Sequence, residues 1–163
     1  MQEGFVMSKI KPYIISVLIA LVTGGLSAFL TRNNMDVYTE FATPPLSPPS
    51  ILFPIVWGIL YVLMGVGAAM IYSTRIADDD KKARTLFVYA VSLFVNFCWS
   101  IFFFNMKLFL FSFFWLIILW ILILKTILDY SKIDRVAAYL QIPYLIWVTF
   151  AGYLNFGIWF LNR

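Results

Sequence analysis

Five long stretches of this chain contain no Asp, Glu, Lys, Arg or His, and together they cover 107 of its 163 residues. A helix needs about 20 apolar residues to cross the ~30 Å hydrocarbon core of a bilayer, and it satisfies its own backbone hydrogen bonds there, as an open strand cannot. The sequence therefore predicts an all-α integral membrane protein, a bundle of five transmembrane helices. The uncharged stretches are Tyr13–Thr31, Ile51–Ser73, Leu86–Met106, Leu108–Leu124 and Val136–Asn162.

The composition excludes a soluble domain and several classes of site. Hydrophobic residues make up 63% of the chain and charged residues only 12%, with a mean hydropathy of +0.90, which no soluble domain of this size shows. The chain has no His, and its one cysteine, Cys98, lies inside the third stretch, so we expect neither a disulfide framework nor a metal site. We expect one domain over residues 1–163, with spans at about 12–31, 51–73, 86–106, 108–124 and 136–162 and a first loop at 32–50.

The Lys and Arg residues are distributed unequally between the two sides of the predicted bundle. One side has Arg32, Lys107 and Arg163, and the other has Lys9, Lys11, Arg75, Lys81, Lys82, Arg84, Lys125, Lys132 and Arg135. Because loops rich in Lys and Arg stay in the cytoplasm, we expect a multi-pass protein of the cell membrane with its N-terminus cytoplasmic and its C-terminus outside. The net charge of +4 itself says little, and we expect no nucleic-acid partner.

The first loop ends in four prolines within six positions, in the segment Pro44–Pro49. Proline fixes φ and biases the preceding residue toward extended geometry, so we expect a stiff extended strap, with Ser50 capping the second span. Such a strap is either a rigid linker or a lid over a cavity that opens on the outer side. The lid is favoured, because the Gly/Ser repeats and charge runs typical of linkers are absent from the loop.

Aromatic, small and polar residues recur at helical spacing in three of the spans. Residues three and four apart share a helix face, so each of these helices presents one Trp beside a small or polar neighbour. These tryptophans are either interfacial anchors or parts of a site, and their polar neighbours favour a site. The three faces are Pro54, Trp57, Tyr61 and Gly65; Ser92, Asn96, Trp99 and Phe103; and Tyr144, Trp147, Ala151 and Leu154.

Polar side chains inside a membrane usually face the bundle interior. We expect Gln141 and Asn155 to form hydrogen bonds between helices. Asn96 lies on the face of Trp99, so it is equally a packing residue or part of a site.

Three segments resemble the tryptophan-rich sensory protein family, TspO/MBR, which includes the translocator protein or peripheral benzodiazepine receptor. They are Pro44–Gly65, Asn96–Phe104 and Ala138–Asn155, which are similar to the family's first loop with its second helix, its third helix and its fifth helix. The similarity extends over roughly Gly24 to Asn162. It implies a five-helix bundle, often a homodimer, that binds porphyrins, sterols or synthetic aromatic ligands in a pocket beneath the first loop.

The resemblance also implies which residues bind the ligand. The cholesterol-recognition pattern near the C-terminus lacks its Tyr, since Phe156 stands there, so sterol binding is not carried over. The family's pocket positions fall on Phe53, Trp57, Asn96, Trp99, Phe103, Trp147, Ala151 and Leu154, and Tyr61 joins them as a hydrogen-bonding neighbour.

Two classes of function fit these residues. The first is a membrane receptor or carrier for a porphyrin, haem or a similar flat aromatic ligand, which would stack on Trp57, Trp99 and Trp147, with no cofactor required. The second is a photo-oxidative enzyme that degrades porphyrin; conventional acid–base catalysis is not expected, because no span holds a group that titrates near pH 7. An ion-coupled transporter is disfavoured, since no span contains a carboxylate or His.

A porphyrin ligand brings two propionates that cannot lie unpaired in hydrocarbon. On the predicted outer side, Arg32 is the candidate propionate partner, because it lies where the first span meets the loop and its guanidinium can bind a carboxylate bidentately. The alternative is that Arg32 only anchors its helix at the interface. Haem is expected to gain no strong axial ligand, since Cys98 is the one soft ligand that the third span offers.

Overall fold

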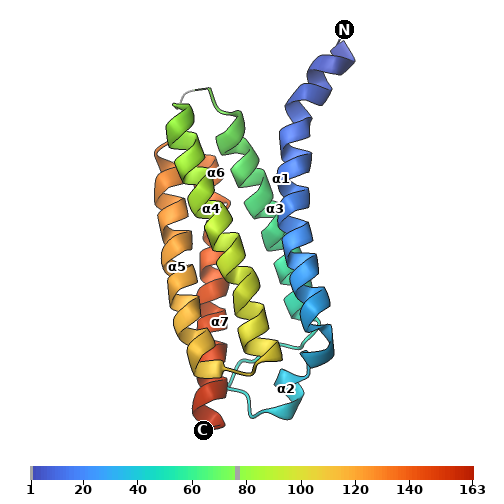
Figure 1. Ribbon diagram of the computed structural model, residues 1–163, viewed down its shortest axis with the longest axis vertical. Helices are drawn as coiled ribbons and strands as arrows, with labels where there is room; N and C mark the ends of the chain where they lie inside the picture. Colours follow the sequence, from blue (N-terminus) through green and yellow to red (C-terminus); the bar gives the residue numbers. More distant parts are fainter. Residues whose placement is uncertain (1, 76–77) are drawn as a thin grey trace.

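The protein is a bundle of five long helices that lie side by side, as the computed structural model shows (Figure 1). The model describes residues 2–75 and 78–163, apart from the side chains of residues 2–8. All five helices are long and apolar enough to cross a membrane, and the described residues form no β-strand, so the predicted fold class is confirmed. The helices are α1 (Gln2–Thr31), α3 (Leu52–Ser73), α4 (Asp79–Ser100), α5 (Phe109–Ser131) and α7 (Ile142–Leu161).

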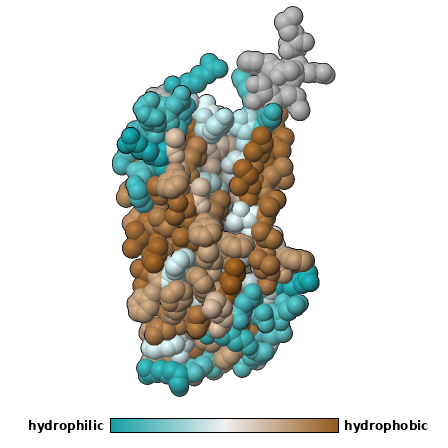
Figure 2. All heavy atoms as spheres, in the orientation of Figure 1, coloured by the Kyte–Doolittle hydropathy of each residue, from teal (hydrophilic) through white to brown (hydrophobic). Residues whose placement is uncertain are grey.

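The outer surface of the bundle carries the apolar side chains that face lipid. Figure 2 shows a broad hydrophobic belt between two hydrophilic ends. Large apolar residues are exposed along the belt, among them Val22 at 64%, Phe94 at 63% and Ile146 at 65%. A soluble protein rarely exposes so continuous an apolar surface, so this belt is where the bilayer covers the molecule.

The helices extend beyond the uncharged stretches that the sequence defines. α1 begins at Gln2 and α5 continues to Ser131, because a helix does not have to end where the hydrocarbon ends. The fifth span differs more. It is interrupted after a short helix, α6 (Arg135–Tyr139), and resumes as α7, where Pro143 lies in the first turn and has no N–H to donate back to the preceding turn.

The proline segment Pro44–Pro49 is only partly the extended strap that we predicted, because Pro45 and Leu46 form a turn in which Leu46 has a φ of 68°. The first loop also contains regular structure before this segment. Its first half contains a 3₁₀ turn, η1 (Arg32–Asn34), and a short helix, α2 (Val37–Glu40). The predicted cap is wrong: Ile51 occupies the N-cap of α3 without a side-chain cap bond, and Ser50 contributes its backbone carbonyl to the amide of Phe53 at 3.3 Å. The prolines themselves prevent regular helix only in the second half of the loop.

α4 does not end directly but passes into a π-helical turn, η2 (Ile101–Asn105). The backbone amide of Met106 donates to the carbonyl of Ile101 at 3.1 Å, five residues back. A π turn widens the helix by one residue, and such turns are frequent at functional sites. This one buries both Phe103 and Phe104 in the bundle.

Candidate ligand-binding site

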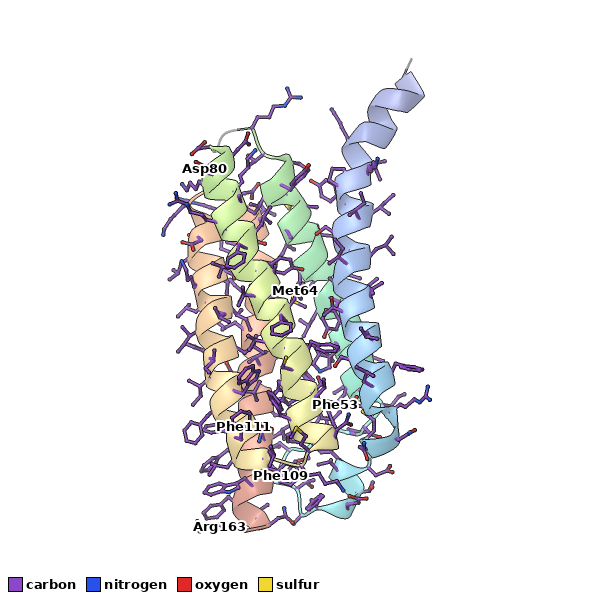
Figure 3. The ribbon with its side chains drawn as sticks, in the orientation of Figure 1. Phe53, Met64, Asp80, Phe109, Phe111 and Arg163 are labelled. Carbon is purple, nitrogen blue, oxygen red and sulfur yellow. The ribbon has the colours of Figure 1, made fainter. Side chains whose placement is uncertain are left out.

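The tryptophan faces of α3, α4 and α7 meet inside the bundle, near the end that the first loop covers. The rings of Trp57 and Trp99 lie 6.4 Å apart between their centroids, and Trp99 stacks on Phe103 at 5.3 Å. Phe53 meets the edge of Trp147 at 5.9 Å. We call these five residues the aromatic cluster. Figure 3 labels Phe53 near the lower end of the bundle, beside the loop.

A buried hydrogen bond ties the aromatic cluster to a polar neighbour. The Asn96 amide donates to the Tyr61 hydroxyl at 3.0 Å, and the Tyr61 ring stacks on Trp57 at 5.7 Å. Both residues are buried. Asn96 is therefore fixed against α3 through Tyr61.

The last two predicted positions lie on α7. Ala151 is buried within the same core cluster as Tyr61, Trp99 and Phe103. Leu154 is fully buried but does not join that cluster of buried apolar side chains. Ring contacts and the Asn96 hydrogen bond thus join seven of the nine predicted residues into one neighbourhood, with Tyr38 bridging Phe53 and Phe103, while Ala151 and Leu154 are buried on α7.

Five aromatic residues that the sequence prediction did not include also contact the cluster. Two of them are Phe104, which meets Trp99 at 6.1 Å, and Phe150, which meets Trp147 at 5.6 Å. Tyr38 of α2 stacks on Phe53 at 4.7 Å, Tyr144 meets Trp57 edge-on at 6.1 Å, and Phe109 meets Phe103 at 5.3 Å. Helical spacing places Tyr144 on the face of Trp147, so that signal was present. Helical spacing could not identify Tyr38 or Phe109, because Tyr38 lies in the first loop and Phe109 in the fourth span, outside the three patterned helix faces.

The two amides that we expected to link helices do so. The Asn155 side chain accepts from the Trp99 indole at 3.1 Å and donates to the Phe109 carbonyl at 2.6 Å, which joins α7 to α4 and α5. Gln141 donates to the Met64 carbonyl of α3 at 3.4 Å. The Trp99 indole is thereby held by Asn155 of α7.

Three buried polar atoms at the site have no hydrogen-bond partner within the described part of the chain. They are the Asn96 amide oxygen, the Tyr144 hydroxyl and the Trp147 indole nitrogen. A buried polar atom without a partner costs about 1–3 kcal/mol, and native proteins contain few of them. These three atoms are therefore hydrogen-bonding capacity that the buried side chains leave unused.

The space at the site is small in this conformation. A cavity of about 90 Å³ lies between α1, α3 and α4, against Phe53, Trp57, Tyr61 and Trp99. Pockets that hold small organic ligands enclose about 300–1,000 Å³. The aromatic side chains fill their own site, so a ring of porphyrin size requires the site to open.

The first loop closes this end of the bundle, where it passes below the helices in Figure 1. Asn162, which follows the last residue of α7, holds the loop backbone at Ala42 with two hydrogen bonds, of 3.0 and 2.9 Å. Tyr153 donates to the Pro45 carbonyl at 2.8 Å, and Lys107 pairs with Glu40 at 2.5 Å. These contacts run between the loop and the ends of α5 and α7.

Arg32 lies apart from the aromatic cluster. Its guanidinium lies over the Phe29 ring, 4.1 Å from the centroid, and its side chain is exposed. Among the described residues no carboxylate pairs with it. Arg32 is not one of the residues that line the small cavity, although its neighbour Thr31 is.

The sequence matches known proteins over nearly its whole length. The model of the TspO/MBR family matches residues 16–160. Tryptophan-rich protein TspO from Chlorobaculum tepidum is 38% identical over 83% of this chain and 85% of its own. The protein of the same name from Archaeoglobus fulgidus is 33% identical over 94% and 99%, and the translocator protein from Bos taurus is 30% identical over 90% and 87%. This chain, a five-helix membrane protein with its tryptophans gathered under the first loop, belongs to the TspO/MBR family.

Proposed function

We propose that this protein is a membrane receptor or carrier that binds a porphyrin, or a similarly flat aromatic and hydrophobic molecule, in the aromatic cluster beneath the first loop. The observation that carries the proposal is the gathering of tryptophans from three helices: Trp57 meets Trp99, and Trp147 meets Phe53, with unpartnered buried polar atoms on α4 and α7. Large flat rings stack well on indoles, and such contacts add about 0.5–1.5 kcal/mol each beyond burial of apolar area. Membership of the family agrees with a role in binding or sensing.

The polar atoms give such a ligand an orientation. The Trp147 indole and the Tyr144 hydroxyl offer donors, and the Asn96 amide oxygen offers an acceptor. A metal-free tetrapyrrole has both N–H groups and acceptor atoms, so it carries a partner of the right kind for each of the three. A purely apolar ligand of the same size would leave them unpaired, which makes them a source of selectivity.

The site must enlarge before it holds a ring of this size, and we place the movement at α1 and the first loop. The small cavity already lies between α1 and the tryptophans of α3 and α4. The residues of α1 that line it, Gly24, Ser27, Ala28 and Thr31, are small. Separation of this part of α1 from α3 would widen the cavity beside Phe53, Trp57 and Trp99.

The orientation of the ligand follows from its charge. With the N-terminus cytoplasmic, as the positive-inside rule predicts, the loop and Arg32 lie on the outer side. The propionates of a porphyrin would then point toward that interface, where Arg32 has to leave the Phe29 ring to pair with a carboxylate. The homodimer that the family resemblance implies remains part of this proposal.

The test is titration of the purified protein in lipid nanodiscs with protoporphyrin, in the dark, with Trp quenching as the readout. We expect saturable quenching, and a loss of affinity worth about 1–3 kcal/mol for Trp99→Ala and Trp147→Ala, the range between a stacking contact and burial of a whole side chain. Trp159→Ala, on α7 away from the cluster, is the matched control. Equal losses for all three variants would mean that the substitutions act on folding, and the proposal would fail.

Two further comparisons test the role of Arg32 and distinguish a receptor from an enzyme. Arg32→Gln should weaken binding of the free acid but not of its dimethyl ester; equal affinities for both ligands in both proteins would remove Arg32 from the site. Repeating the titration under light distinguishes binding from turnover. Loss of the porphyrin spectrum only in the presence of protein and light would favour the photo-oxidative enzyme over the receptor.

A further inference from the structure

A second and larger hollow lies toward the opposite end of the bundle from the first loop. It is a groove of about 600 Å³ between α1 and α4, with α3 at its floor. Figure 2 shows this hollow in the upper half of the molecule, between α1 and the body of the bundle. It shares no residue with the small cavity beside the tryptophans. We call it the α1–α4 groove.

The groove exists because small residues face α1 at this level. Ala68 and Ala69 of α3 and Ala90 of α4 line it, where larger side chains would fill the gap. α1 cannot settle deeper, because its backbone at Val17 already touches α3 at Gly65; a β-carbon added to Gly65 would lie 2.6 Å from the Val17 α-carbon. The space therefore persists beside a tight helix contact.

The groove is apolar inside and polar at one end. Ile15 and Ile19 of α1 and Leu93 of α4 continue the apolar lining, whereas Lys11 and Tyr72 lie at the end nearer the chain's N-terminus. Both of these side chains are exposed. No ion pair of Lys11 occurs among the residues that the structure describes. A molecule with an apolar tail and one negatively charged group fits the groove, with its tail along the apolar lining and its charge beside Lys11.

We propose that the α1–α4 groove is a binding site for an anionic phospholipid from the leaflet at the cation-rich end of the bundle. Its acyl chain would lie along the alanines and its phosphate would pair with Lys11. The volume of the groove falls within the range of about 300–1,000 Å³ that ligand pockets occupy. Basic pockets between transmembrane helices are known places for anionic headgroups, and each cation near such a surface adds about 1 kcal/mol.

The charge argument distinguishes this occupant from others. An aromatic ligand for the tryptophans would find only tyrosine rings here, and a neutral lipid or sterol would make no use of Lys11. A second copy of the chain would bring no anion to Lys11 from the exposed apolar faces of its helices. The groove is also on the lipid-facing side of α1, so a lipid reaches it by lateral diffusion.

The experiment uses the whole protein in nanodiscs with equal amounts of phosphatidylglycerol and phosphatidylcholine, followed by native mass spectrometry of the lipid that stays bound. We expect retained phosphatidylglycerol to exceed phosphatidylcholine. Lys11→Gln should reduce this preference about fivefold, which is what ~1 kcal/mol from one cation amounts to. Lys81→Gln removes the same charge at the same end outside the groove, and should leave the preference unchanged.

A filling variant tests the apolar part independently of charge. Ala90→Phe should reduce retention of both lipids, with a thermal unfolding scan to establish that the protein still folds. An unchanged preference in Lys11→Gln, or an equal loss in Lys81→Gln, would overturn the proposal in favour of diffuse surface charge. It would also fail if Ala90→Phe abolished a dimer while lipid retention stayed the same, because the groove would then hold a second copy.

Discussion

Two adjacent glycines in α1 allow a sharp test of how this helix packs on the site. A β-carbon added to Gly24 would lie 2.5 Å from Cδ2 of Tyr61, whereas one added to Gly25 would meet nothing within 4 Å. The Tyr61 ring cannot swing away, because it stacks on Trp57 and its hydroxyl accepts from Asn96. Gly24→Ala should therefore push α1 away from α3, and Gly25→Ala should not.

The magnitudes follow from two opposing effects. Overpacking in a well-packed core costs about 1–3 kcal/mol, and replacing Gly by Ala within a helix returns about 0.5–1 kcal/mol. Gly24→Ala should lose about 1–2 kcal/mol of unfolding free energy, equivalent to a Tm lower by about 3–6 °C for a chain of this size. Gly25→Ala should be neutral or raise the unfolding free energy by up to about 1 kcal/mol.

The assay is thermal unfolding of both variants in the same lipid nanodiscs, with a double mutant as the internal check. Tyr61→Leu removes the ring that the new methyl group strikes, so Gly24→Ala should cost much less in that background; the difference measures the clash directly. If Gly24→Ala proves as stable as Gly25→Ala, then α1 does not approach Tyr61 this closely and our description of the α1–α3 contact is wrong.

Three other substitutions should give distinct outcomes. Gly65→Ala should lose about 1–3 kcal/mol of unfolding free energy because its methyl group would strike the Val17 backbone, while Gly58→Ala on the same helix, with nothing within 4 Å, should not; equal melting temperatures would contradict this. Asn155→Ala should lower the unfolding free energy by about 1–3 kcal/mol, because it leaves the Trp99 indole and the Phe109 carbonyl unpaired. A loss no larger than that from replacing an exposed Asn by Ala would contradict this. Asn162→Ala should speed hydrogen exchange in residues 41–50 with little change at the core, since it frees the loop at Ala42; unchanged exchange would show that other contacts hold the loop.

The sequence predicted the parts of this fold that depend on local pattern. Uncharged length defines a membrane span whatever its neighbours are, so five helices were expected and five are present. Spacing of three and four residues defines a helix face, so Trp57, Trp99 and Trp147 could each be assigned to an inward face before any packing was known. Their convergence required the packing itself, because three separate faces need not meet.

The remaining features depend on contacts between distant segments, and no local pattern encodes them. The π turn after Ser100 is one case: the run Ile101–Asn105 reads as ordinary apolar helix, and only its packing widens it. Tyr38 is another, because a loop residue reaches Phe53 through the path of the chain. The break in the fifth span is a third case: Pro143 lies in the first turn of α7, but the uncharged length of the span indicates one continuous helix.

The closed site has an energetic consequence for the proposed function. Asn96, Tyr144 and Trp147 keep polar atoms buried without partners, at about 1–3 kcal/mol each, so closure does not exploit every interaction that these residues offer. A ligand shifts a conformational equilibrium only by the difference between its affinities for the two states. A ligand of porphyrin size cannot fit the closed cavity of about 90 Å³. Such a ligand therefore binds only the open conformation, and its whole binding free energy shifts the equilibrium toward that conformation. Tyr61 connects this change to α1, because it contacts Gly24 on one side and Asn96 on the other. On the function we propose, movement of α1 and occupation of the site are one transition, so a variant that separates α1 from Tyr61 should also change ligand affinity.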